Sequence, residues 1–175
     1  PDRSLASMGI YVFNTGLLLE MLQEDMANAN SSHDFGKDII PEAVRRGLAC
    51  AHPFSLSSVG ADNVSPYWRD VGTVDAYWSA NIDLTMLTPA LDMYDSSWPI
   101  WTYQEQLPPA KFVFDHDDRR GMAVDSIVSG GCVISGSRVA RSVLFSKCRI
   151  NSYCTVEGSV LLPGVEMERH SRLKN

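Results

Sequence analysis

IVSGGCVISGSRVARSVLF, residues 127–145, carries a hydrophobic side chain at every sixth position. Ile127, Val133, Val139 and Phe145 occupy these positions. The series then continues, with two steps of five residues, through Ile150, Val156, Leu162, Met167 and Leu173. This spacing fits no helical period. It indicates a repeated structural unit that is shorter than a helix–turn–helix pair.

A small or compact residue lies two positions before almost every one of these hydrophobic residues. The set is Gly131, Ser137, Val143, Cys148, Cys154, Val160, Val165 and Ser171. Such a hexapeptide repeat is the signature of a parallel β-helix, in which each repeat supplies one short strand and three repeats make a coil. We expect the aliphatic side chains to point inward and the small residues to let the chain turn its corners.

The chain therefore divides into an α/β part, residues 1–95, a linker, 96–125, and a β-helix, 126–175. The repeat is still running at Asn175, and the chain lacks an initiator Met, so we expect an internal fragment of a longer protein. In the α/β part we expect strands and helices to alternate. The expected strands are 10–13 and 48–54, and the expected helices are 17–22, 42–46 and one starting after Thr73.

The stretch Tyr67-Trp68-Arg69-Asp70-Val71-Gly72-Thr73 has a charged centre among aromatic and aliphatic residues. Thr73 is expected to cap a helix whose buried face carries Val74, Tyr77, Trp78 and Leu84. Asp70 then precedes a helix start, a place where carboxylates hold metal ions or sugar hydroxyls. The alternative is that Asp70 pairs with Arg69 or caps a turn.

Other polar clusters favour structural roles. Ser7 precedes Gly9 at the start of an expected strand, which suits either the close approach of a ligand or a plain strand entry. His33-Asp34 is interpreted as a loop, residues 115–118 (Asp-His-Asp-Asp) as a solvated turn, and His170 as an exposed turn residue.

Composition excludes several classes of function. The net charge of −6 leaves no basic stripe for nucleic acid. No apolar run approaches the length of a membrane span. The four cysteines have no Cys-x-x-Cys spacing, so they are expected to be small buried residues in a reducing cytoplasm.

Several segments together resemble the bacterial ADP-glucose pyrophosphorylases (glucose-1-phosphate adenylyltransferases). They are residues 7–13, 32–38, 67–73, 107–112 and 128–136. The resemblance covers essentially the whole chain, in order. It implies the rear part of a Rossmann-like nucleotidyltransferase domain followed by the start of a left-handed parallel β-helix. It also implies the reaction of ATP with α-glucose 1-phosphate to give ADP-glucose and pyrophosphate, a step of bacterial glycogen biosynthesis.

The same resemblance assigns roles to particular residues. Ser7 matches the family serine that contacts glucose 1-phosphate, and Asp70 matches the aspartate near the sugar phosphate and Mg²⁺. Ser129, Gly130 and Gly131 lie where the family binds allosteric effectors, although a simple turn accounts for them equally. The family enzymes are homotetramers that require Mg²⁺ and take ATP, glucose 1-phosphate and small-molecule effectors.

Two other functions stay open on the sequence. One is a different sugar-1-phosphate nucleotidyltransferase, which uses another nucleotide. The other is a hexapeptide-repeat acyltransferase or a non-catalytic regulatory subunit, and His170 is the only candidate for the histidine that such acyltransferases carry near their coils.

The family's glycine-rich ATP loop and its Glu-Lys-Pro motif do not occur among these 175 residues. We therefore predict that the 175-residue chain, assayed alone with ATP, glucose 1-phosphate and Mg²⁺, forms no ADP-glucose. Detection of ADP-glucose by chromatography above a no-protein blank contradicts this prediction.

Overall fold

A computed structural model describes residues 6–57, 67–97, 99–101 and 103–175. The chain forms two compact units, Pro1–Leu56 and Ser57–Asn175. Each unit has its own hydrophobic cluster, so the two are described separately.

The first unit is built on two helices, α1 (Thr15–Ala27) and α2 (Ile40–Arg45). Asn14 caps α1, because its Oδ1 accepts the backbone N–H groups of Gly16 and Leu17. A short π-helix, η1 (Phe35–Ile39), leads directly into α2. Both helices expected in this region are thus confirmed.

A small core holds these helices together. Met21 of α1, Ile39 of η1 and Ala43 of α2 are buried against one another. Phe13, Leu17 and Leu22 are only partly buried at its edge. The buried contact is small, as expected for a unit of this size.

Neither strand expected in the first unit forms. Residues 10–13 are irregular and Val12 is 99% exposed. Residues 48–53 are also irregular and are followed by a single 3₁₀ turn, η2 (Phe54–Leu56). A β-favouring run becomes a strand only when a partner supplies its hydrogen bonds, and the described residues of this unit supply none. The Ser/Gly/Asn-rich composition of residues 55–65 predicts a surface loop or hairpin, and this segment lies mostly outside the described residues.

Helix α3 (Val74–Asp83) opens the described part of the second unit. Thr73 caps it as expected, since its Oγ1 accepts the Ala76 N–H at 3.2 Å. The expected buried face was wrong, because Val74 is 85% exposed and Tyr77 is also exposed. Only Trp78 and Leu84 of that face are partly covered.

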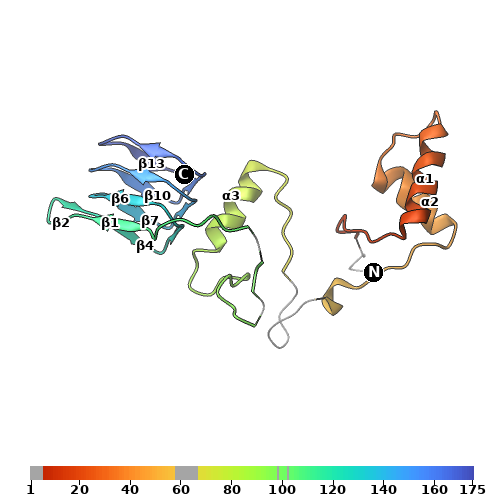
Figure 1. Cartoon of the computed structure of the whole chain (residues 1–175), viewed down its shortest axis with the longest axis horizontal. Helices are drawn as coiled ribbons and strands as arrows, with labels where there is room; N and C mark the ends of the chain where they lie inside the picture. Colours follow the sequence, from red (N-terminus) through yellow and green to blue (C-terminus); the bar gives the residue numbers. More distant parts are fainter. Residues whose placement is uncertain (1–5, 58–66, 98, 102) are drawn as a thin grey trace. The chain divides into compact units, whose positions relative to one another are not determined.

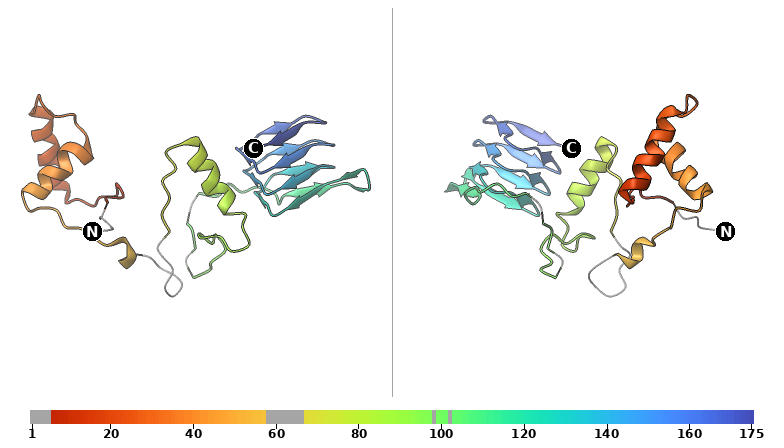
Figure 2. Two further views of the ribbon diagram at one scale, coloured as in Figure 1. Left: turned by 180° about the vertical axis from the view of Figure 1, so that it is seen from behind. Right: turned by 45° about the vertical axis from the view of Figure 1, so that its right-hand side comes forward.

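After an irregular segment, residues 111–174 of the second unit form a parallel β-solenoid, as the repeat predicts (Figure 1). One sheet contains β1 (Lys111–Val113), β6 (Val133–Ser135), β9 (Arg149–Ile150) and β12 (Glu166–Met167). The second contains β4 (Met122–Val124), β7 (Arg138–Ala140), β10 (Thr155–Glu157) and β13 (Arg172–Lys174). The third contains β5 (Ile127–Val128), β8 (Val143–Leu144) and β11 (Val160–Leu161). Figure 2 shows the coils stacked on one another from two further sides.

The solenoid begins with β1, inside the 96–125 segment and earlier than the sequence repeat indicates. Phe112 of β1 pairs with Ile134 of β6. Between β1 and β4 the chain makes an antiparallel hairpin of β2 (Asp115–His116) and β3 (Arg119–Arg120). This insertion breaks the six-residue spacing and hides the first coil from sequence inspection.

The register expected for the inward side chains was wrong at four positions. Ile127, Val133, Phe145 and Leu162 were expected to point inward, and the structure places Val128, Ile134, Leu144 and Leu161 there instead. Ile134 and Leu144 are 0% exposed, whereas Leu162 is 54% exposed. Val139, Ile150, Val156 and Met167 are buried as expected.

The cause of this error is the length of a coil. Ile134 pairs with Ile150 sixteen residues later, and Ile150 pairs with Met167 seventeen residues later. Strict hexapeptides would give coils of eighteen residues, so steps of five occur more often than the sequence pattern suggests. Two adjacent hydrophobic residues stand at each misassigned position, and either could have been the inward one.

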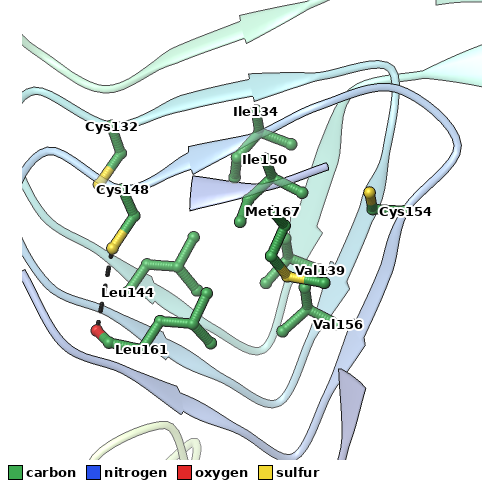
Figure 3. Packing of buried hydrophobic residues seen from close by; sticks show 10 residues of the cluster. All are labelled: Cys132, Ile134, Val139, Leu144, Cys148, Ile150, Cys154, Val156, Leu161 and Met167. Atoms are coloured by element: carbon green, nitrogen blue, oxygen red, sulfur yellow. Dashed lines mark hydrogen bonds between the residues drawn. The ribbon is translucent and has the colours of Figure 1, made fainter. Parts of the chain in front are cut away.

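In the corrected register the small residues fall into columns at the corners. Cys132, Ser142 and Ser159 replace the expected Gly131, Val143 and Val160, and all three are buried. Figure 3 shows Cys132 and Cys148 on successive coils beside the aliphatic stack. A small side chain is needed at these positions because the corner brings the backbone close to the core.

The serine column also completes the backbone hydrogen bonding. Ser142 Oγ donates to the Ala140 carbonyl at 2.7 Å and accepts the Ser159 N–H at 3.1 Å. Ser126 Oγ bonds in the same way to Val124 O and Ser142 N. Within the described residues, no buried side-chain nitrogen or oxygen lacks a partner. The Ser126 and Ser142 hydroxyls therefore each tie one coil to the next.

Val156 lies in the middle of the stack, between Val139 and Leu173, and is 0% exposed. We predict that Val156→Asp lowers the free energy of unfolding, measured by urea denaturation, by about 4 kcal/mol or more, because the charge would be buried without a partner. Thr155→Asp is the control, since Thr155 lies between Arg138 and Arg172 in the same strand register and should change stability little. Equal losses for the two variants contradict the inward assignment.

The cysteines are free thiols, but they are not all buried. Cys132, Cys148 and Cys154 lie in the core, whereas Cys50 is exposed and corrects the expectation for that residue. Cys50 is exposed because it lies in the irregular segment that does not form the expected strand. Burial raises the pKa of the Cys148 thiol to about 11 and also raises the pKa of Cys132.

We predict that a thiol reagent modifies only Cys50 in the folded protein at neutral pH, because buried neutral thiols are poor nucleophiles. The other three cysteines should react only after unfolding in denaturant, as counted by mass spectrometry. Cys50→Ser is the control and should abolish labelling of the folded protein. Labelling of Cys148 at the rate of Cys50 would show that the corner is open.

Candidate functional site

Asp70 lies in an exposed loop directly before α3. Its Oδ1 accepts the Gly72 N–H at 2.9 Å, which closes a tight turn. Among the described residues, its second carboxylate oxygen has no hydrogen-bond partner. The carboxylate is therefore oriented by the backbone and still presents an oxygen to solvent.

The loop is fastened to α3 at both ends of the helix. Arg69 forms an ion pair with Asp83 at 3.2 Å, and Thr73 caps the first turn. Arg69 thus points to the last turn of α3 and leaves the Asp70 carboxylate to Gly72. Of the two structural alternatives for Asp70, turn capping is the one that the structure contains.

Ser7 lies in the first unit, in the irregular segment before α1. Its hydroxyl is 2.8 Å from the Tyr11 hydroxyl and accepts the Gly9 N–H at 3.2 Å. Gly9 has φ +74°, a conformation that side chains disfavour. Ser7 is exposed, and a Cβ added at Gly9 would meet no atom within 4 Å, so the turn beside Ser7 is open.

The corner after β5 consists of Ser129, Gly130 and Gly131. Residues 107–108, which precede β1, lie against this corner. The Gly131 N–H donates to the Pro108 carbonyl at 2.7 Å. A Cβ on Gly130 would come within 3.2 Å of the Leu107 side chain. These glycines therefore have a packing role of their own, which is to let the 107–108 segment lie against the corner.

One ion pair lies beside this corner. Lys147 Nζ is 2.6 Å from a carboxylate oxygen of Glu105, and Lys147 also donates its backbone N–H to the Gly130 carbonyl. Both charged side chains are about half exposed. The corner thus combines a cation, an acid and two glycines on one edge of the solenoid.

The other polar clusters have structural roles, as the sequence indicated. His33 Nδ1 is 2.7 Å from the Asp25 carboxylate. His33 does not pair with its neighbour Asp34, whose side chain accepts the Lys37 N–H and caps η1. The 115–118 cluster forms the β2–β3 hairpin, held by an Arg120–Asp115 ion pair. His170 is exposed and stacks on Tyr153 with ring centroids 4.9 Å apart.

Sequence inspection missed two features. Arg46 bonds to both Glu24 of α1 and Glu42 of α2, and the hydrogen bonds of Arg45 and Arg46 lower the pKa of Glu42 to about 2. Trp78 Nε1 donates to the Gly158 carbonyl at 2.7 Å, eighty residues away. No local signal in the sequence marks the Arg46–Glu24 and Trp78–Gly158 contacts, because these partners are distant along the chain. The Glu42–Arg46 pair is local and has the i,i+4 spacing of a helix.

Metal binding requires donor side chains that lie close together. The described residues contain no group of three or more His, Cys, Asp or Glu side chains that could hold a metal ion by themselves. A single carboxylate fits the way Mg²⁺ is usually held, with substrate phosphates and water as the other ligands. Asp70, with one oxygen free, has the chemistry for that role.

Comparison with known proteins gives the family. The family model of nucleotidyl transferases matches residues 1–86, and the model of the GlmU-like C-terminal hexapeptide matches residues 108–175. The chain is 60% identical over 174 residues to the glucose-1-phosphate adenylyltransferase of Dechloromonas aromatica (strain RCB), covering 99% of this chain and 40% of that protein. It is a homologue of the glucose-1-phosphate adenylyltransferases.

Two further adenylyltransferases agree closely. That of Paramagnetospirillum magneticum is 61% identical over 99% of this chain and 41% of its own length. That of Shewanella sp. (strain ANA-3) is 60% identical over 100% of this chain and 41% of its own length. The chain thus spans about two fifths of the relatives it matches.

The family assignment confirms both the resemblance and the fold expected from the repeat. Ser7 and Asp70 fall in the nucleotidyl transferase match, and Ser129, Gly130 and Gly131 fall in the hexapeptide match. No helix in the described part of the chain is long and apolar enough to cross a membrane. The left-handed sense of the coil and the assigned domain limits stay predictions.

Proposed function

We propose that this chain is part of a cytoplasmic glucose-1-phosphate adenylyltransferase, which converts ATP and α-D-glucose 1-phosphate to ADP-glucose and pyrophosphate. The observation that carries this proposal is the identity of about 60% to such enzymes, which extends over 99% of the chain. In this reaction a phosphate oxygen of glucose 1-phosphate attacks the α-phosphorus of ATP, and the bond to pyrophosphate breaks. The protein contributes mainly positioning and charge stabilisation.

Asp70 is proposed to act at the sugar phosphate and to ligate Mg²⁺. Its Oδ1 is fixed by the Gly72 N–H, so the free oxygen has a defined direction. Bound Mg²⁺ would neutralise the charge on the phosphates that approach one another. Asp70 itself would supply the negative charge that holds the ion beside the substrate.

Ser7 is proposed to hydrogen-bond glucose 1-phosphate. Its hydroxyl already pairs with the Tyr11 hydroxyl and the Gly9 N–H, so its oxygen is held in place on an exposed turn. A hydroxyl can both donate and accept, which suits a phosphate ester or a sugar hydroxyl. Ser7 would therefore orient the substrate without taking part in proton transfer.

Ser129, Gly130 and Gly131 are proposed to belong to a site for small-molecule allosteric effectors in a homotetramer. The support is the nearby Lys147–Glu105 ion pair and the close packing of the 107–108 segment on the glycines. An anionic effector could compete with Glu105 for Lys147. Such an exchange would change how tightly residues 107–108 are held against the corner.

The test is an assay of the full-length protein with glucose 1-phosphate and a panel of ATP, UTP, GTP and dTTP. We expect pyrophosphate release and a sugar nucleotide with ATP, and little with the other nucleotides. A preference for another nucleotide would make the protein a different sugar-1-phosphate nucleotidyltransferase. Absence of any sugar nucleotide would overturn the proposal.

We predict that Asp70→Asn lowers kcat/KM of the full-length protein by about 10²–10³-fold and raises the Mg²⁺ concentration needed for half-maximal activity. Asn keeps an oxygen that can accept the Gly72 N–H, so the turn should survive while the charge is lost. Asp75→Asn is the matched control, since Asp75 is an exposed carboxylate in the first turn of α3. Equal activity of Asp70→Asn and the parent would exclude Asp70 from the site.

A further inference from the structure

Among the described residues, one side-chain hydrogen bond, partly shielded from solvent, joins helix α3 to the solenoid. The indole N–H of Trp78 donates to the backbone carbonyl of Gly158 at 2.7 Å, and the contact is partly shielded from solvent. Gly158 forms the corner between β10 and β11, and its φ is +59°. A Cβ there would come within 2.5 Å of the Asn175 side chain, so the corner is tightly shaped. Figures 1 and 2 show α3 beside the solenoid from each side.

Packing alone holds α3 weakly. None of its residues is fully buried, and its contact with the solenoid is centred on β11. The exposed Val74 and Tyr77 contribute little burial. A directional hydrogen bond from a large, half-covered aromatic side chain is therefore the main contact that fixes how the helix is placed.

Helix α3 is also connected to the loop that carries Asp70. Thr73 caps α3, and the Arg69–Asp83 ion pair ties the preceding loop to the last turn of the helix. Asp70 then closes its turn on Gly72. A continuous series of contacts thus runs from the solenoid corner at Gly158, through Trp78 and α3, to the Asp70 carboxylate.

We propose that Trp78 is a positioning residue, which sets the location of the Asp70 loop through its hydrogen bond to Gly158. This inference rests on the proposed function, because it assigns a consequence for substrate binding at Asp70. Loss of the hydrogen bond frees α3 to shift as a body. The Asp70 oxygen then no longer meets the sugar phosphate in one fixed position.

The test uses Trp78→Phe in the full-length protein, because phenylalanine keeps an aromatic ring while it removes the N–H donor together with part of the indole. We expect the KM for glucose 1-phosphate to rise roughly three- to tenfold, the factor that one hydrogen bond supplies, while KM for ATP and the melting temperature change little. Hydrogen exchange should become faster at the Gly72 and Ala76 amides, which donate to the Asp70 and Thr73 side chains. A merely structural role would lower stability and the active fraction without moving this KM.

Tyr77→Phe is the matched control, because Tyr77 is the neighbouring exposed aromatic residue of α3 and loses only a hydroxyl. It should leave both KM and amide exchange at parental values. An unchanged KM for glucose 1-phosphate in Trp78→Phe, or an equal rise in Tyr77→Phe, overturns the proposal. If the parent protein makes no sugar nucleotide, the proposed function has failed; faster exchange at Gly72 in Trp78→Phe then still supports the anchor, and unchanged exchange rejects it.

Discussion

Stacking of equivalent residues on successive coils is the constraint on which the second unit depends. Each strand of a coil places an inward aliphatic side chain against its equivalent on the neighbouring coil, as in the Leu144–Leu161 and Val139–Val156 pairs. Parallel backbone bonds between coils hold this register. The corner hydroxyls of Ser126 and Ser142 add to it, because they accept the Ser142 and Ser159 N–H groups of the next coil. A coil that slipped by one residue would turn its aliphatic side chain to solvent, so the backbone pairing and the core stabilise the same arrangement.

Local interactions were the part of the fold that could be predicted. Asn14 and Thr73 cap their helices by accepting amides two or three residues away, so the neighbouring sequence contains the signal for the cap. The repeat likewise predicted a β-helix. Its register could not be read, because adjacent aliphatic residues such as Val133 and Ile134 are equivalent in sequence and only coil length, sixteen or seventeen residues here, separates them.

The two expected strands do not form because a strand depends on a partner segment that the local sequence does not reveal. Residues 10–13 carry β-favouring side chains, yet a strand exists only through hydrogen bonds to another segment. The described first unit provides helices around Met21 and no sheet for this run to join. For the candidate site, sequence reasoning located Asp70 and its turn. It left the partner of Arg69 open, because Asp83 lies at the far end of α3, a helix whose buried face was predicted incorrectly.

These observations separate a rigid element from an adjustable one. The solenoid is held by a continuous buried core and by hydrogen bonds along every face. Helix α3 has no fully buried residue, so its place is set by a few directional contacts. Free energies of such contacts are small compared with the burial of a core. The carboxylate of Asp70 therefore depends on the weaker element, and its geometry responds to changes at the Gly158 corner that leave the solenoid intact.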